Sequence, residues 1–296
     1  MKIYKSILII LLGITGSLSA QQSSIYSQYM FNGLALNPAY AGHDEVLSLT
    51  FLARAQSVGL DGAPKTQTFS AHTPIMKQKI GVGFQLYHET IGISEQTGGY
   101  FSYSYRLKYR KYTLSFGLQA GANFYNSNYT SLLINDPGDP AFSSDLRETV
   151  FNFGSGVLLN TDLYYIGLSM PQMLSAKNEI TQEKPFFAYG GYLVNISSFL
   201  KLKPSTLLKI ESGRPVEWDI NASVLLNNML WAGVSFRPAN ALVFILEFQA
   251  TEQLAIGYAY DATVNKLRTA ESGSHEILIN YRFRFSQKGT ISPRYF

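Results

Sequence analysis

The chain repeats one pattern: segments of about ten residues in which every second side chain is apolar. From Tyr112 to Tyr125, one set of alternate positions carries chiefly Leu, Phe and Ala, and the other carries chiefly Thr, Ser, Gly, Gln and Asn. The same two-residue period recurs around Ile80, Phe101 and Ile277. Successive side chains of a strand point to opposite faces, whereas the apolar residues of a helix recur every three or four positions. The pattern therefore predicts strands with one apolar and one polar face.

Along the whole chain, this alternation predicts fourteen strands separated by turn residues. The candidates lie near residues 46–56, 66–73, 79–90, 96–109, 112–127, 149–160, 163–172, 186–197, 205–213, 217–227, 230–237, 241–250, 254–263 and 275–285. An even number of strands is typical of a single-chain outer-membrane barrel.

The composition of the polar face indicates whether the apolar face meets lipid or a dry core. Asp, Glu, Lys and Arg make up 15% of the chain, below the roughly 25% of a soluble globular protein. A soluble β-sandwich or lipocalin-like barrel would place the apolar set in a dry core and charged residues outside. Here the second set is mostly small and uncharged, so the apolar set is expected to face lipid. The expected fold is all-β: a transmembrane antiparallel β-barrel of about 14 strands over residues 45–285, with a short N-terminal plug segment and a C-terminal tail.

The connections between the predicted strands differ in length. Three are short, at residues 110–111, 227–229 and 251–253, and they predict antiparallel hairpins. The longest gap, residues 130–148, predicts an external loop. If that loop faces outward, strand parity puts the short turns on the periplasmic side. Aromatic residues cluster toward strand ends, as interfacial girdles require. They are Tyr109, Tyr112, Tyr125, Tyr129, Tyr164 and Tyr165.

Residues 1–20 have the three parts of a secretory signal peptide. Lys2 and Lys5 precede an apolar run, and small residues lead to Ala20. The apolar run is shorter than the roughly 20 residues of a membrane span, which argues against the alternative of a membrane anchor. We expect the mature chain to begin at Gln21.

The sequence lacks the residues that metal binding, nucleic-acid binding or catalysis would require. There is no Cys, the four His are far apart in sequence, and the net charge is +4, too weak to indicate nucleic acid. We therefore expect no cofactor, no metal centre and no enzymatic activity. Asp136, Asp139 and Asp145 have the oxygen ligands that suit calcium, but their spacing does not match an EF-hand, and solvated turn residues are the favoured interpretation.

Residues 21–44 are too apolar for a solvated tail, and Pro38 and Gly42 interrupt regular structure. Such a segment has to be buried, either as a plug in the barrel or as a brace against the first strand. The residues expected to plug the barrel or bind a partner are Tyr29, Met30, Phe31, Asn32, Asn37, Pro38, Tyr40 and Gly42, together with Arg294, Tyr295 and Phe296 of the tail.

Charged residues also fall on the inward-facing set. They are Arg54, Arg106, Lys108, Lys209, Glu211, Asp219, Glu247, Asp261, Glu276, Arg282 and Arg284. Both signs are present, so these residues either pair across the lumen or line a polar passage; pairing is the favoured interpretation. Residues 286–296 extend past the last predicted strand and end in two aromatic residues, which predicts a tail that returns to the lumen or meets a periplasmic partner.

Three motifs carry a family resemblance: the run from Ser27 to Gly42 (SQYMFNGLALNPAYAG), His72-Thr73-Pro74, and the terminal Pro293-Arg294-Tyr295-Phe296. Together they resemble the PorP/SprF family, outer-membrane proteins of the type IX secretion system of Bacteroidota. The resemblance covers nearly the whole mature chain, and the N-terminal run is its specific part. It implies a fourteen-stranded barrel that works with secreted proteins carrying a C-terminal sorting domain, in some members with large gliding adhesins or a periplasmic, peptidoglycan-linked lipoprotein.

Two rival functions stay open at this point. Asn37-Pro38-Ala39 also resembles the hatch of FadL-like outer-membrane channels for hydrophobic small molecules, which likewise have fourteen strands. A lipid-modifying enzyme would need a nucleophile oriented by a base, yet no Gly-x-Ser-x-Gly elbow occurs in the sequence.

Overall fold

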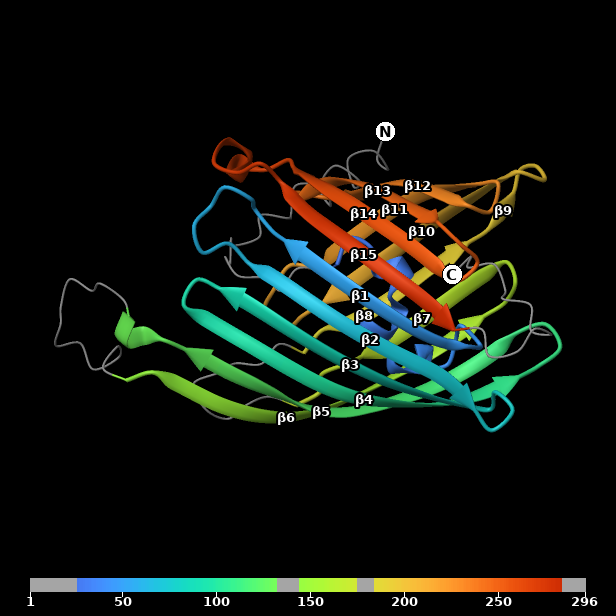
Figure 1. Ribbon diagram of the computed structural model, residues 1–296, viewed down its shortest axis with the longest axis horizontal. Coiled ribbons are helices and arrows are strands. Elements are labelled where there is room, and N and C mark those ends of the chain that lie inside the picture. Colours follow the sequence, from blue (N-terminus) through green and yellow to red (C-terminus); the bar gives the residue numbers. More distant parts are fainter. Residues whose placement is uncertain (1–25, 132–143, 175–183, 284–296) are drawn as a thin grey trace, which may run out of the picture.

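The computed structural model describes residues 26–131, 144–174 and 184–283. Fifteen strands join in one antiparallel sheet, and the sheet closes because β15 pairs with β1 and β10 pairs with β11 (Figure 1). The strands are β1 (Leu47–Ala55), β2 (Lys65–Ile75), β3 (Ile80–Ile91), β4 (Ser94–Lys108), β5 (Thr113–Ser127), β6 (Leu146–Asn160), β7 (Tyr164–Met170), β8 (Phe186–Tyr192), β9 (Val194–Asn195), β10 (Leu200–Ile210), β11 (Glu217–Leu226), β12 (Leu230–Arg237), β13 (Ala241–Gln249), β14 (Leu254–Thr263) and β15 (Ser274–Phe283).

The fifteenth strand is a continuation of another one. Strands β8 and β9 pair with β10 in one continuous register, Gly191 opposite Ser205 and Val194 opposite Leu202. The ladder is interrupted between them, where Pro204 of β10 has no N–H to donate. The wall therefore has 14 strand positions, which confirms the predicted strand number. The strand expected at residues 205–213 instead begins at Leu200, because the barrel accommodates the proline within it.

Side chains on the wall alternate as the sequence predicts. On β5, Phe116, Leu118 and Phe124 are 45%, 62% and 54% exposed, whereas their neighbours Gln119 and Asn123 are buried. The apolar positions thus point out of the barrel. On a strand tilted by about 40°, the stretch from Leu114 to Phe124 covers about 25 Å along the axis, the height of the apolar band of an outer-membrane barrel.

The two ends of the barrel differ. One end, which we call the turn end, holds the start of β1, the end of β15 and short connections such as 109–112 and 227–229. The opposite end, which we call the loop end, holds the connection between β5 and β6, and these two strands extend further there than β2 and β3 do (Figure 1). The three short connections identified in the sequence all lie at the turn end.

The expected aromatic girdle is only partly right. Tyr109 and Tyr112 are exposed and stack at 4.7 Å between ring centroids, and Tyr164 also faces outward. Tyr165, by contrast, is buried and faces the lumen, and Tyr125 accepts a hydrogen bond from the inward-facing Gln96. Alternation moves a residue to the opposite face with each step along a strand, so proximity to a strand end does not place a tyrosine in the girdle.

Among the short helical elements are η1 (Tyr29–Phe31), η2 (Gly33–Ala35), η3 (Pro38–Tyr40), η4 (Tyr129–Ser131) and η6 (Lys266–Thr269). In the three described ranges, no helix has the length and apolar character needed to cross a bilayer.

Candidate functional site

Residues 26–44, which we call the luminal segment, lie inside the ring of strands, in blue in Figure 1. The side chains of Tyr29, Phe31 and Leu34 are 2%, 1% and 1% exposed. They are buried against inward-facing side chains of the wall, including Leu207, Trp231 and Leu278. These contacts make the luminal segment the apolar core of a barrel whose other apolar face is turned to lipid.

The luminal segment forms three single turns of 3-10 helix rather than one continuous helix. Asn37 and Pro38 explain the third turn. The Asn37 side chain accepts a hydrogen bond from the backbone N–H of Ala39 at 2.9 Å, and Pro38 takes the first helical position. An Asn cap followed by Pro is a favoured way to begin a helical turn, because it satisfies a free donor and fixes φ.

Asn37 also fastens this turn to the wall. Its Nδ2 donates to the carbonyl oxygens of Val157 on β6 and Leu168 on β7, at 3.0 and 3.3 Å. Next to it, the Ser169 hydroxyl donates to the carbonyl of Leu36 at 2.6 Å. The side-chain amide of Asn37 thus forms hydrogen bonds with both the luminal segment and the barrel wall.

Glycines in the wall let the luminal segment approach the strands at backbone distance. A Cβ atom on Gly117 of β5 would overlap the backbone of Pro38 and Ala39, and a Cβ atom on Gly81 of β3 would overlap the carbonyl of Ala41. Between them, Ser104 of β4 donates to that same carbonyl at 2.7 Å. Gly81 and Gly117 therefore leave space that the backbone of the luminal segment occupies, and any side chain larger than that of glycine would fill this space.

Five charged residues meet near the other end of the luminal segment, and we call them the ionic cluster: Arg54, Asp219, Arg237, Asp261 and Glu276. Arg54 pairs with Asp261 at 2.7 Å and with Glu276 at 3.1 Å, and Arg237 pairs with Asp219 at 2.7 Å and with Asp261 at 3.3 Å. All five side chains are almost fully buried. Pairing, the favoured interpretation of the inward charges, is confirmed for Arg54, Asp219, Asp261 and Glu276, whereas the sequence reading had left out Arg237.

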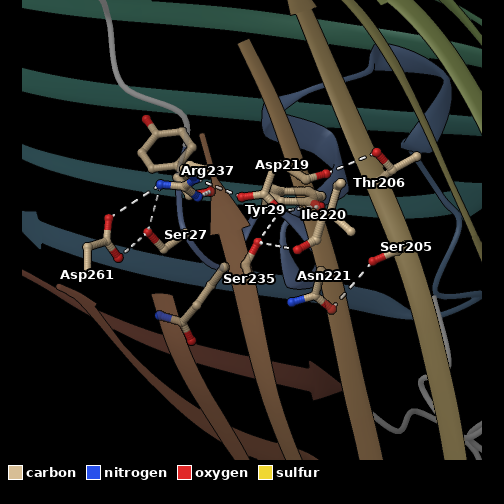
Figure 2. Close-up of polar contacts among 12 residues, drawn as sticks. Ser27, Tyr29, Ser205, Thr206, Asp219, Ile220, Asn221, Ser235, Arg237 and Asp261 are labelled. Atoms are coloured by element: carbon tan, nitrogen blue, oxygen red, sulfur yellow. Dashed lines mark hydrogen bonds and ion pairs between the residues drawn. The ribbon is translucent and has the colours of Figure 1, made fainter. Parts of the chain in front are cut away.

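The ionic cluster holds the luminal segment by its backbone. The Glu276 carboxylate accepts from the N–H of Ser27 at 2.9 Å and from the N–H of Gln28 at 2.8 Å. Figure 2 shows Ser27 between Asp261 and Arg237; its hydroxyl donates to Asp261 at 2.6 Å. With three carboxylates and two guanidinium groups, the cluster has one excess negative charge, which these donors help to stabilise.

Aromatic and cationic groups surround η1. The Tyr29 hydroxyl donates to Asp219 at 3.4 Å (Figure 2). Phe31 lies 6.5 Å from the ring of Trp231, and the Lys203 ammonium lies 4.4 Å from the Trp231 ring centroid. A buried ammonium over an indole is a favourable cation–π contact. Lys203 is a second inward charge that the sequence reading missed.

At the turn end, wall side chains bind the exit of the luminal segment. His72 accepts a hydrogen bond from the backbone N–H of Gly42 at 3.2 Å, and Arg106 donates to the Gly42 carbonyl at 2.7 Å. His43 stacks on Tyr40 at 4.5 Å. Burial lowers the pKa of His43 to about 4, although the nearby Asp44 acts in the opposite direction. His43 is therefore neutral at pH 7.

A small cavity of ≈ 20 Å³ remains between the luminal segment and the wall. Its lining is mainly aromatic and apolar, and it includes Tyr29, Leu36, Tyr40, Leu158 and Tyr189. That volume has room for about one water molecule, so it is a packing gap.

The structure places the eight N-terminal candidate residues together within the luminal segment: Tyr29, Met30, Phe31, Asn32, Asn37, Pro38, Tyr40 and Gly42. The tail candidates Arg294, Tyr295 and Phe296 lie outside the described residues, as do the leader, Asp136 and Asp139. Ser27 and Gln28, which carry the contacts to Glu276, were in the recognised N-terminal run but not among the candidates. Small polar residues beside an aromatic run give no signal that a buried carboxylate binds them.

Asp145 accepts hydrogen bonds from the backbone and the hydroxyl of Thr130, which lower the pKa of its carboxyl group. Within the described ranges, no three His, Asp or Glu side chains are grouped so that they could hold a metal ion.

Comparison with known proteins gives one family. The sequence matches the family described as type IX secretion system membrane protein PorP/SprF over residues 18–281. No curated protein sequence matches the chain. Among solved structures, the outer membrane protein Omp33 of Acinetobacter baumannii is similar with 10% identity and a TM-score of 0.47, over 81% of this chain and 100% of that one. The toluene transporter TbuX of Ralstonia pickettii is similar with 11% identity and a TM-score of 0.48, over 88% and 94%.

Proposed function

Because the chain belongs to the PorP/SprF family of type IX secretion system membrane proteins, we propose that it is a non-enzymatic outer-membrane barrel that docks and anchors secreted cargo. The cargo is a protein with a C-terminal sorting domain, in one version a large gliding adhesin. In this proposal, the loop end faces the cell surface and the turn end faces the periplasm, where a peptidoglycan-linked lipoprotein is the partner.

One observation supports the proposal: in the described part of the chain, a buried peptide is seated in the lumen. The luminal segment is buried, hydrogen-bonded to β6 and β7 through Asn37, and bound by Glu276 of β15. A conducting channel needs a continuous polar path. A barrel braced from inside instead offers a rigid support for loops that hold a partner.

The first experiment compares conduction with docking. In planar bilayers, we expect the purified barrel to be silent, because the luminal segment fills its seat. Affinity purification from the native membrane is expected to recover a secreted protein with a C-terminal sorting domain. Large steady currents without any such protein would instead favour the alternative, a FadL-like channel for hydrophobic small molecules.

The second experiment removes the luminal segment. No strand pair of the described wall includes residues 27–41, so the variant without them is expected to remain a folded, heat-modifiable barrel. It is expected to conduct ions and to retain less cargo. Unchanged cargo retention would make the segment a brace with no role in docking.

A further inference from the structure

Two neighbouring connections at the turn end carry a dense group of cations. The connection between β2 and β3 has Lys77 and Lys79, and the connection between β4 and β5 has Arg110 and Lys111. The two lie side by side, because the N–H of Arg106 donates to the carbonyl of Lys79 at 2.8 Å. With Lys108 at the end of β4, these five exposed side chains form what we call the basic rim.

The backbone presents these cations at the tips of tight turns. Tyr109 N–H donates to the Tyr112 carbonyl at 2.9 Å, which leaves Arg110 and Lys111 as the two central residues of that turn. In the other connection, Met76 and Lys77 have φ of 47° and 54°, the left-handed region, and Met76 is 70% exposed. Non-glycine residues held in this region are unusual, and Lys77 and Lys79 are both exposed in this turn.

Few negative charges oppose the rim. In the described part of the chain, the carboxylate in ion-pair contact with it is that of Glu45, which meets Lys108 and lies 3.9 Å from Arg106. Lys108 thus contacts a carboxylate oxygen of the chain itself. Lys77, Lys79, Arg110 and Lys111 have no ion pair within the described ranges.

The rim lies where the lipid-facing wall ends. Tyr109 and Tyr112, 54% and 40% exposed, stack directly behind Arg110 and Lys111, and Tyr105 and Phe116 continue the lipid-facing surface from there. Tyrosines at such a boundary mark the headgroup level of a bilayer, and basic side chains there attract anionic headgroups.

We propose that the basic rim binds the phosphodiester headgroups of anionic phospholipids in the periplasmic leaflet. The proposal rests on the orientation given in the proposed function and adds a lipid partner to it. Phosphatidylglycerol fits because its headgroup carries a net negative charge, whereas phosphatidylcholine balances its phosphate with its own ammonium group. Lipid bound to Lys108 would compete with Glu45, and so would act on the exit of the luminal segment.

Native mass spectrometry of the full mature barrel can test this, after release from nanodiscs that contain equal amounts of phosphatidylglycerol and phosphatidylcholine. The wild type is expected to retain phosphatidylglycerol preferentially. In the double variant R110Q/K111Q, the ratio of retained phosphatidylglycerol to phosphatidylcholine is expected to fall by about tenfold. The matched control is K266Q/R268Q, which removes two exposed cations from η6 at the loop end and is expected to behave as the wild type does. Higher salt should reduce the wild-type preference, because these charges are exposed.

Three results would overturn the proposal: no preference in the wild type, an equal loss in both double variants, or unchanged lipid retention in R110Q/K111Q together with loss of a co-purifying periplasmic protein. The last result would assign the rim to an acidic protein surface. Heat modifiability of each variant confirms folding. Since lipid retention needs no cargo, failure of cargo docking would leave this test intact.

Discussion

The two ends of the luminal segment are held in different ways. Ser27 and Gln28 are bound by buried charge, through Glu276 and the ionic cluster. Pro38 to Ala41 are held by shape, because glycines in β3 and β5 leave room for their backbone. The comparison teaches that the ionic hold depends on the number and sign of nearby charges, whereas the shape-based hold depends on the absence of side chains. Four experiments separate the two.

The largest effect is expected from Gly117→Val. The new side chain would occupy the position of the Ala39 backbone and displace the luminal segment, at a cost of about 3 kcal/mol or more. The measurement is the rate at which maleimide labels a cysteine introduced at Met30, which is 6% exposed in a chain without native cysteine.

The matched control is Gly99→Val. Its added Cβ meets one atom of Leu86, at 3.8 Å, so labelling is expected to stay at the wild-type rate. Equal labelling of the two valine variants would mean that wall glycines do not seat the segment.

A loss of similar size is expected from Arg54→Met. It leaves three buried carboxylates with Arg237 as their remaining cation within the ionic cluster. Breaking a buried ion pair on one side typically costs about 3–5 kcal/mol. Urea unfolding of the barrel in lipid vesicles would measure the loss.

A second substitution gives the charge test its control. In Arg54→Met with Glu276→Gln, the cluster returns to its original net charge, and partial recovery of stability is expected. A double variant as unstable as Arg54→Met alone would show that geometry, and not charge balance, sets the cost.

An intermediate effect is expected from Asn37→Ala, about 2 kcal/mol, because two wall carbonyls and the Ala39 N–H lose their partner. Asn32→Ala is the matched control: Asn32 is equally buried, but its Nδ2 has no hydrogen-bond partner among the described residues. Equal losses in the urea midpoint of the two variants would contradict the assigned role of Asn37.

The smallest effect is expected from pH. The pKa of His43 falls from 6.5 to about 4 on folding, so the unfolded chain binds the proton first as pH drops. Stability from this group is therefore complete above pH 6.5 and decreases as pH falls toward 4, by about 1–2 kcal/mol at pH 5. Asp44 and Glu45 favour the proton there, whereas Arg106 and His72 oppose it. In His43→Phe, which keeps a ring on Tyr40, the labelling rate at Met30→Cys should lose this pH dependence; an unchanged profile would assign it to another group.

The strands of the wall could be predicted from the sequence, because apolar and polar side chains alternate within each strand and so indicate which side chains face outward. Pro204 was the exception: the strand predicted at residues 205–213 begins at Leu200 and includes this proline, next to which the pairing of β8 and β9 is interrupted. The contacts of the candidate site could be predicted less well. The run from Ser27 to Gly42 shows that it must be buried, but Glu276 and Arg54 lie more than 200 residues apart along the chain.

The sequence by itself determined a closed, lipid-facing barrel and a buried N-terminal segment, because alternation and apolarity are local properties. The tertiary structure decided which wall residues hold that segment. Gly117, Asn37 and Glu276 acquire their roles only when the ring closes and brings distant strands around one short peptide, since contacts across a lumen leave no periodic trace in the chain.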